Sequence, residues 1–122
     1  MDVRNCYKQM GGDYEEAIRL MGNDERIIRY LKIFRKDTNF SSLCYAIQHN
    51  DMKAAFHAAH TIKGVALNLS LTSLAVQIKD LTEILRIGIL NEEVLSLLQK
   101  TEKTYALVLE SIETLINESL NR

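Results

Sequence analysis

Residues 51–69 read DMKAAFHAAHTIKGVALNL, and this stretch decides the fold that the sequence predicts. It contains no proline, and small or aliphatic residues recur every three or four positions, which is the spacing of one helix face. On a helical wheel with about 100° per residue, this core-facing stripe consists of Ala55, Ala58, Ala59, Ile62, Val65, Ala66 and Leu69. We therefore predict a long amphipathic helix that begins after Asp51, whose side chain is a suitable N-cap.

The opposite face of this helix carries the candidate functional residues. The residues within about 60° of His60 on the wheel are Lys53, Phe56, His57, Lys63, Gly64 and Leu67. His60 is therefore predicted to lie at the solvent-exposed surface. An imidazole, an ammonium group one turn later and an adjacent position without a side chain suit a nucleophilic histidine that holds a phosphoryl group while another protein approaches closely.

Each neighbour of His60 has a physical reason to be there. A glycine inside a helix costs about 0.5–1 kcal/mol relative to alanine, so Gly64 suggests that something must approach closely. The positive charge of Lys63 disfavours the imidazolium form of His60, and the neutral imidazole is the form that attacks phosphorus. The same ammonium group can then pair with phosphoryl oxygens. Phe56 and Leu67 offer a partner an apolar surface, unless they pack on a neighbouring helix.

The rest of the chain also has helical periodicity, and proline is absent throughout. We expect an all-α fold, an up-down antiparallel four-helix bundle with short N-terminal cap helices, as one domain over residues 1–122. The cap helices occupy residues 1–22 and the bundle residues 23–119, with Asp13, Asn23 and Asn91 as further N-caps. The third helix is expected to turn an apolar stripe inward, comprising Ile27, Ile28, Tyr30, Leu31, Ile33 and Phe34.

Composition excludes several classes of function. A net charge of -1 and the lack of tryptophan argue against binding to nucleic acid or to anionic membranes. Cys6 and Cys44 follow no metal or redox spacing and are expected to be reduced thiols, which favours the cytoplasm. No signal peptide or membrane-spanning segment is visible. The chain also lacks a phosphate-binding loop, a nucleotide fingerprint and a carboxylate cluster for Mg²⁺, so the phosphoryl donor and the metal are expected to come from partners.

The other histidines have less specific interpretations. His57 and His60 are spaced i, i+3, which suits metal binding, but no carboxylate lies near them on that face, and no metal site is predicted. His57 is expected to be a solvated residue at the rim of the site. His49 precedes Asn50 and Asp51 in a turn and is expected to be structural.

The stretch from Ala59 to Ala66, the following Asn68-Leu69 pair and the leucine-bearing segment 71–86 together resemble a histidine-containing phosphotransfer (HPt) domain. The resemblance extends more loosely over residues 13–118 and favours a free-standing bacterial protein. It implies that His60 is phosphorylated, that Lys63 stabilises the phosphohistidine and that Gly64 leaves room for a receiver domain. It also implies reversible transfer without intrinsic kinase activity, in a multistep relay whose partners are receiver domains of response regulators and hybrid histidine kinases.

Two positions depart from the pattern of the family. Ser70 stands where members often have glycine, and its side chain can cap the next helix. Thr82 stands where a longer polar residue, often glutamine, supports the histidine, so Arg86 one turn later is expected to take over part of that role. Residues expected to meet a partner are thus Lys53, Phe56, His57, Leu67, Thr82 and Arg86.

Three other functions remain open on the sequence alone. The first is a scaffold or regulatory bundle that binds a receiver domain or a histidine kinase without carrying phosphate. The second is a purely structural bundle, and the third is a metal enzyme. The cognate partners, the signal and the direction of phosphate flow are not encoded in any motif. The resemblance favours a monomer that needs no cofactor of its own and takes Mg²⁺ from the receiver.

Overall fold

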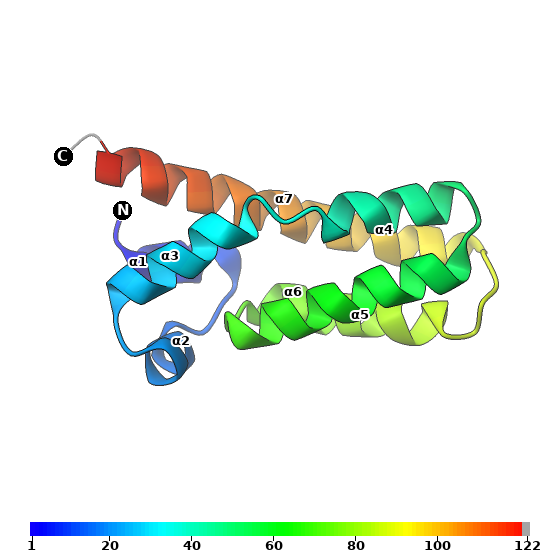
Figure 1. Ribbon diagram of the computed structural model, residues 1–122, viewed down its shortest axis with the longest axis horizontal. Helices are drawn as coiled ribbons and strands as arrows, with labels where there is room; N and C mark the ends of the chain where they lie inside the picture. Colours follow the sequence, from blue (N-terminus) through cyan, green and yellow to red (C-terminus); the bar gives the residue numbers. More distant parts are fainter. Residues whose placement is uncertain (121–122) are drawn as a thin grey trace.

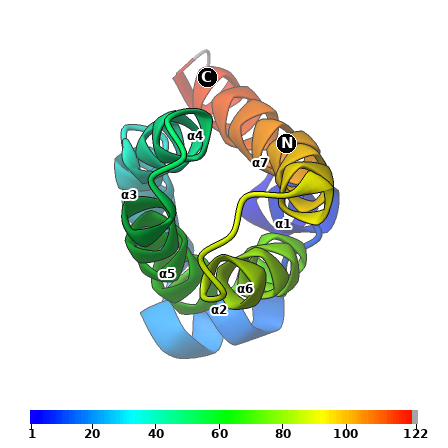
Figure 2. The same cartoon turned by 90° about the vertical axis from the view of Figure 1, so that its right-hand side faces the viewer.

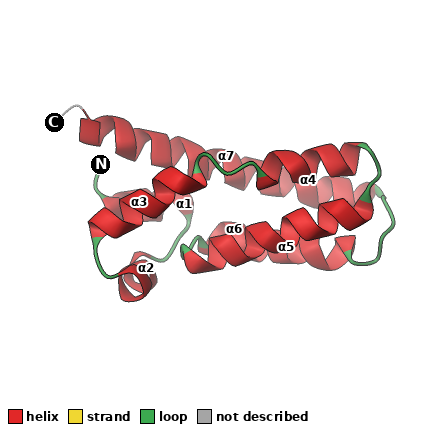
Figure 3. Ribbon diagram, viewed as in Figure 1, coloured by secondary structure: helices red, strands yellow, loops and turns green. Residues whose placement is uncertain are grey.

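The computed structural model describes residues 1–120, which form seven α-helices and no strand (Figures 1 and 3). The helices are α1 (Val3–Met10), α2 (Tyr14–Met21), α3 (Asp24–Phe34), α4 (Asn39–Gln48), α5 (Met52–Asn68), α6 (Thr72–Leu85) and α7 (Glu92–Leu120). The predicted all-α class is confirmed. The predicted domain over residues 1–122 includes Asn121 and Arg122, which lie outside the described residues. Within residues 1–120, no helix has the length and apolar character needed to cross a membrane.

Most helices begin where the side chain of an aspartate or asparagine can accept a hydrogen bond from an otherwise unpaired backbone N–H group. The side chains of Asp13, Asn23 and Asp51 accept the N–H groups of Glu16, Arg26 and Ala54 at 2.8–3.1 Å. Asn91 accepts the N–H of Val94 at 3.0 Å in the same way. Each bond satisfies one of the donors that a helix start leaves without an intrahelical partner, so these four predicted caps are confirmed.

Helices α4, α5, α6 and α7 form the predicted up-down bundle and surround one core, as the end view shows (Figure 2). Each of these helices runs antiparallel to the next along the chain (Figure 1). The most deeply buried residues of this core are Leu43, Ala55, Ala59, Ile78, Leu81 and Val94. The side of α5 that was predicted to face the core therefore does so, and the opposite side of α5 is left facing outward.

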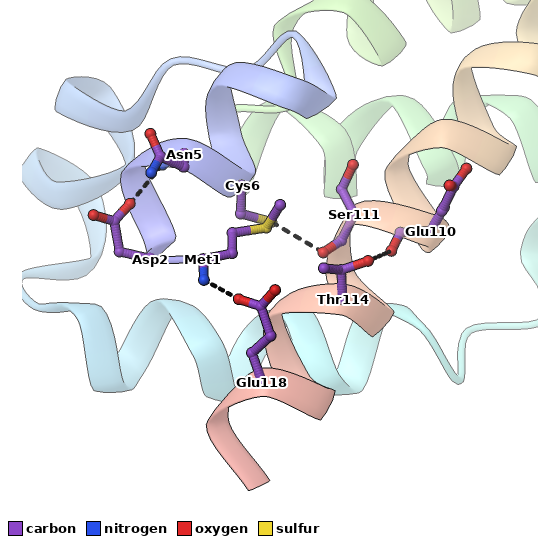
Figure 4. A network of polar contacts seen from close by, with 8 residues as sticks. All are labelled: Met1, Asp2, Asn5, Cys6, Glu110, Ser111, Thr114 and Glu118. Atoms are coloured by element: carbon purple, nitrogen blue, oxygen red, sulfur yellow. Dashed lines mark hydrogen bonds and ion pairs between the residues drawn. The ribbon is translucent and has the colours of Figure 1, made fainter. Parts of the chain in front are cut away.

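A second core lies at the other end of the molecule, where the long helix α7 extends past α5 and α6 (Figure 1). Helices α1 and α3 contact this part of α7, and α2 packs on α1 and α3. Tyr7, Ile27, Leu31 and Ile112 are completely buried in this core. Figure 4 shows polar contacts that accompany this packing, including the Met1 amino group paired with Glu118 and the Cys6 thiol directed at the carbonyl oxygen of Ser111 at 3.5 Å. The N-terminal helices are thus packed firmly onto the bundle.

The inward stripe predicted for α3 is wrong at two positions. The side chains of Tyr30 and Ile33 are 44% and 60% exposed, whereas Ile27, Leu31 and Phe34 are buried. Helix α3 lies at the edge of the second core and contacts α1, α2 and α7 with one narrow face. A stripe of six apolar residues is wider than that face, so the flanking residues of α3 remain at the surface.

The turn between α5 and α6 is held by the segment that joins α1 to α2. The carbonyl oxygen of Ser70 accepts the N–H of Asp13 at 2.9 Å, and the hydroxyl of Tyr7 donates to the carbonyl oxygen of Leu69 at 2.8 Å. A Cβ atom at Gly12 would lie only 2.9 Å from the Ser70 carbonyl oxygen, so a glycine is needed for this close approach. These contacts fix the C-terminal end of α5 against the N-terminal helices.

Ser70 itself keeps the backbone conformation that a glycine would adopt. Its φ is +57°, in the left-handed region that few residues with a side chain occupy. The expectation that Ser70 caps the next helix is wrong, because the N-cap of α6 is Leu71 and no side chain bonds to that helix start. The buried Ser70 hydroxyl has no hydrogen-bond partner among the described residues.

The substitution Tyr7→Phe is expected to lower the free energy of unfolding by about 1–3 kcal/mol, because it leaves the Leu69 carbonyl without its buried donor. Urea denaturation monitored by circular dichroism measures this change. Tyr14→Phe is the matched control, since the Tyr14 hydroxyl bonds to Asp24 at the solvent-exposed surface. Equal losses in the two variants would contradict a role for Tyr7 in holding the turn.

Candidate functional site

His60 lies on the outer face of α5, near the middle of the helix. Its side chain is exposed, whereas its neighbours Ala59 and Ile62 are 0% and 3% exposed and belong to the bundle core. The exposure predicted from the helical wheel is therefore confirmed. A partner protein can reach the imidazole without any movement of the bundle.

Phe56 organises the site on the side of His60 that faces the end of α6. The Phe56 ring is half-buried and lies nearly parallel to the His60 ring, with 6.0 Å between ring centres and 18° between planes. The guanidinium carbon of Arg86 lies 5.1 Å from the centre of the Phe56 ring, a cation–π distance. Phe56 therefore contacts both the candidate nucleophile and a cation from the neighbouring helix, and its role as a partner surface stays a prediction.

Lys63 and Gly64 follow His60 by one turn of α5. Lys63 is half-buried, and Gly64 is exposed. A Cβ atom at Gly64 would meet no atom outside its own helix within 4 Å, so packing inside the molecule gives no reason for a glycine. The helix tolerates the energetic cost of this glycine, and the open surface beside His60 is what it provides.

The remaining residues predicted on this face of α5 also lie at the surface. Lys53, His57 and Leu67 are exposed, and the Leu67 side chain is 57% exposed. The His57 ring meets Phe56 edge-on, with 5.8 Å between ring centres and 67° between planes. These residues extend over four turns of α5 and form, with His60, Lys63 and Gly64, the surface that we call the His60 face.

Thr82 does not belong to the His60 face, and its prediction as a partner-binding residue is wrong. The side chain is completely buried, and its hydroxyl donates a hydrogen bond to the carbonyl oxygen of Ile78 at 2.6 Å. Thr82 lies on the side of α6 that packs into the bundle, and its short side chain satisfies its polar atom within its own helix. No partner can reach it without opening the core.

Arg86, in contrast, is exposed and reaches the site through Phe56. Its guanidinium lies 3.4 Å from the carboxylate of Glu83, one turn earlier, as well as over the Phe56 ring. The sequence does not reveal the contact with Phe56, because it joins two helices. The i, i+3 spacing of Glu83 and Arg86 is the signal that was available for the ion pair.

The two cysteines are poor candidates for a nucleophile. Burial raises the pKa of the Cys6 thiol to about 11, and burial also raises the pKa of the half-buried Cys44 thiol. Both thiols therefore stay protonated at neutral pH, the form in which a cysteine is unreactive. His49 lies at the end of α4, with Nδ1 2.8 Å from the carbonyl oxygen of Tyr45 and its ring stacked on that tyrosine.

Metal ligands do not gather around His60. Among residues 1–120, no group of three or more histidine, cysteine, aspartate or glutamate side chains is arranged to hold a metal ion. His57 and His60 lie on the same face of α5, as their spacing predicts, and both contact the Phe56 ring. The site therefore consists of an aromatic ring, cationic side chains and a histidine on one open surface.

These features define a helical bundle that presents an exposed histidine, His60, one turn before a lysine and a glycine on the outer face of α5. A family model described as "Hpt domain" matches residues 30–118, which is 89 of the 122 residues. The chain therefore belongs to the Hpt domain family, whose members are phosphocarrier modules of phosphorelays that interact with receiver domains and are not kinases. No curated protein and no solved structure matches the chain.

Proposed function

We propose that this protein carries a phosphoryl group on His60 in a two-component multistep phosphorelay. It accepts the group from the phosphoaspartate of one receiver domain and passes it to another. The observation that carries this proposal is the exposed imidazole of His60 beside Gly64, where the surface is open to a second protein. Membership of the Hpt family supports the same function.

The transfer step needs only one reacting atom from this chain. The lone pair of an imidazole nitrogen attacks phosphorus, the new N–P bond forms, and the bond from phosphorus to the aspartate oxygen breaks. The bonding electrons leave with that oxygen, which becomes a carboxylate again. Mg²⁺ held by the receiver would supply neutralisation of the charge on the phosphoryl group. The reverse reaction uses the same atoms, which allows flow in either direction.

The cationic side chains of the His60 face assist after the group has arrived. Lys63, one turn from His60, brings an ammonium group toward the phosphoryl oxygens. Phe56 limits the rotation of the imidazole by stacking, and Arg86 adds a second positive charge at the Phe56 ring. This arrangement binds and orients a phosphoryl group.

The direct test of this function uses a receiver domain labelled on its aspartate with radioactive phosphate. On mixing with this protein, the label is expected to move to the protein within seconds to minutes and to be acid-labile and base-stable, as a phosphoramidate bond is. Mass spectrometry of the digested protein should locate the group on His60. If cognate receivers bind the protein but no label moves, the chain is a scaffold and the proposal is wrong.

Lys63→Ala is expected to accelerate the loss of phosphate from His60, or to slow transfer, by about tenfold, which corresponds to the loss of about 1.4 kcal/mol from one charge-assisted contact. Time courses of the isolated phosphoprotein and of transfer from a receiver measure the two rates. For the loss of phosphate from the isolated phosphoprotein, Lys53→Ala is the control, because Lys53 lies on the same face about 10 Å from His60 along the helix axis. A large fall in melting temperature for Lys63→Ala would instead mean that Lys63 supports the fold.

A further inference from the structure

Two pockets adjoin at the end of the bundle where α6 leads into α7. The first, between α5 and α6, has a volume of about 480 Å³ and is lined by Met52, Lys53, Phe56, Leu85, Arg86 and Gly88. The second, between α6 and α7, has a volume of about 470 Å³ and is lined by Asp80, Glu83, Ile84, Ile87, Glu93 and Leu97. Arg86 of the first pocket lies 3.4 Å from Glu83 of the second, so the C-terminal end of α6 separates the two.

The two pockets carry opposite charges. The charged side chains that line the pocket between α5 and α6 are the cations Lys53 and Arg86, and we call it the cationic pocket. Those that line the pocket between α6 and α7 are three carboxylates, and we call it the acidic pocket. Lys53 and Glu93, one from each pocket, are exposed on α5 and α7 and are therefore available to a second molecule.

An apolar turn adjoins both pockets, because Ile87 lines the acidic one and Gly88 the cationic one. The side chains of Ile87 and Ile89 in this turn are 69% and 61% exposed. Backbone N–H groups of Ile87 and Gly88 donate to the carbonyl oxygens of Ile84 and Leu85 at 3.2 and 3.0 Å, which holds the turn in place. The segment crosses the end of the bundle between α6 and α7 (Figure 2). Two aliphatic side chains fixed at the surface gain from removal from water, as the core of an interface does.

A surface with an apolar centre, one cationic side and one acidic side is complementary to itself. In a two-fold symmetric contact, each residue meets the same set of residues on the second copy that the second copy meets on the first. With the two-fold axis at the turn, the isoleucines of the two copies meet, and each cationic pocket faces an acidic pocket. Both charge contacts are then attractive, whereas a partner surface of a single charge would be repelled by one of the two pockets.

We propose that this chain forms a two-fold symmetric dimer through the turn after α6, with the cationic pocket of each copy against the acidic pocket of the other. The contact area is small, so the dimer belongs to the weak class of interfaces. This inference does not depend on the proposed phosphorelay function, and it departs from the monomer that the resemblance favours. Phe56 lines the cationic pocket and stacks on His60, so the second copy reaches the edge of the His60 face.

The test uses charge reversal and sedimentation velocity at protein concentrations from about 10 μM to about 1 mM. Lys53→Glu and Glu93→Lys are each expected to raise the dimer Kd at least about tenfold, because each change places like charges opposite one another at two symmetric positions. An equimolar mixture of the two variants is expected to form a heterodimer about as tight as the wild-type dimer, because every facing pair is again of opposite sign. The control Glu110→Lys reverses an exposed charge elsewhere on α7 and should leave the Kd unchanged.

A second pair of variants tests the apolar centre of the contact. Ile87→Ser/Ile89→Ser should also raise the Kd at least about tenfold. Leu20→Ser should not, because Leu20 is 50% exposed on α2, at the opposite end of the molecule (Figure 1). A wild-type protein that stays monomeric over the whole concentration range would overturn the inference. So would a mixture of the two charge variants that stays monomeric, or a dimer that Leu20→Ser or Glu110→Lys weakens as much as the variants at the turn.

Discussion

His60→Gln is expected to abolish phosphoryl uptake from every receiver and from phosphoramidate, while the melting temperature stays within the error of the measurement. Glutamine is polar and of similar size but has no nucleophilic nitrogen, so no covalent intermediate forms. The structural loss is small because the His60 side chain is exposed and its ring contact with Phe56 spans 6.0 Å between centres. Exposed substitutions of this kind usually change stability by less than about 0.5 kcal/mol.

The matched control for this variant is His57→Gln. His57 is also exposed, lies on the same helix and also contacts the Phe56 ring, but it is expected to be dispensable for uptake. The amount of label bound per protein, measured with one receiver for both variants, compares them directly. Full labelling of His60→Gln, or loss of labelling only in His57→Gln, would move the phosphorylation site to a different residue.

Gly64→Gln is expected to raise the stability of the protein and to slow transfer from a receiver. The loss of transfer is the second-largest effect that we predict. The substitution should raise the free energy of unfolding by about 0.5–1 kcal/mol, because glutamine is a better helix former and the new Cβ meets no neighbouring atom within 4 Å. Transfer from a receiver should nevertheless fall about 100-fold, because the long side chain displaces the reacting aspartate from its approach to His60. Denaturation curves and single-turnover transfer rates give the two quantities.

Two comparisons make this prediction specific. Gly64→Ala should also stabilise the helix but slow transfer much less, since a methyl group extends only a short way toward the partner. Phosphoramidate should label Gly64→Gln at the wild-type rate, because a small donor does not need the open surface. If transfer from the receiver proceeds normally in Gly64→Gln, close approach of a partner is not the reason for this glycine.

Much of the fold and part of the site could be predicted because their causes are local in the chain. A cap requires one side chain and a backbone N–H a few residues away, so Asp13, Asn23, Asp51 and Asn91 could be assigned from their positions. The outward direction of His60 follows from the period of α5 and the run of small residues on its opposite face. Neither feature depends on which helix packs alongside.

The errors concern residues whose environment depends on neighbouring helices. Thr82 is one turn from Arg86 on the same helix, yet the first is completely buried and the second is exposed beside Phe56. Tyr30 and Ile33 belong to an apolar stripe on the sequence, but α3 sits at the edge of a second core and leaves both exposed. A helical wheel orders residues around one axis and contains no information about how wide the contact with the next helix is.

The sequence by itself determined that this protein is a set of amphipathic helices, one of which presents His60, Lys63 and Gly64 on an outward face. That much depends on helix periodicity and on the costs of individual residues within one helix. Only the tertiary structure decided that Thr82 is buried, that Arg86 reaches Phe56 and that the N-terminal helices hold the turn after α5. These features arise where helices distant in sequence meet, and their packing is set by the whole core instead of by any one segment.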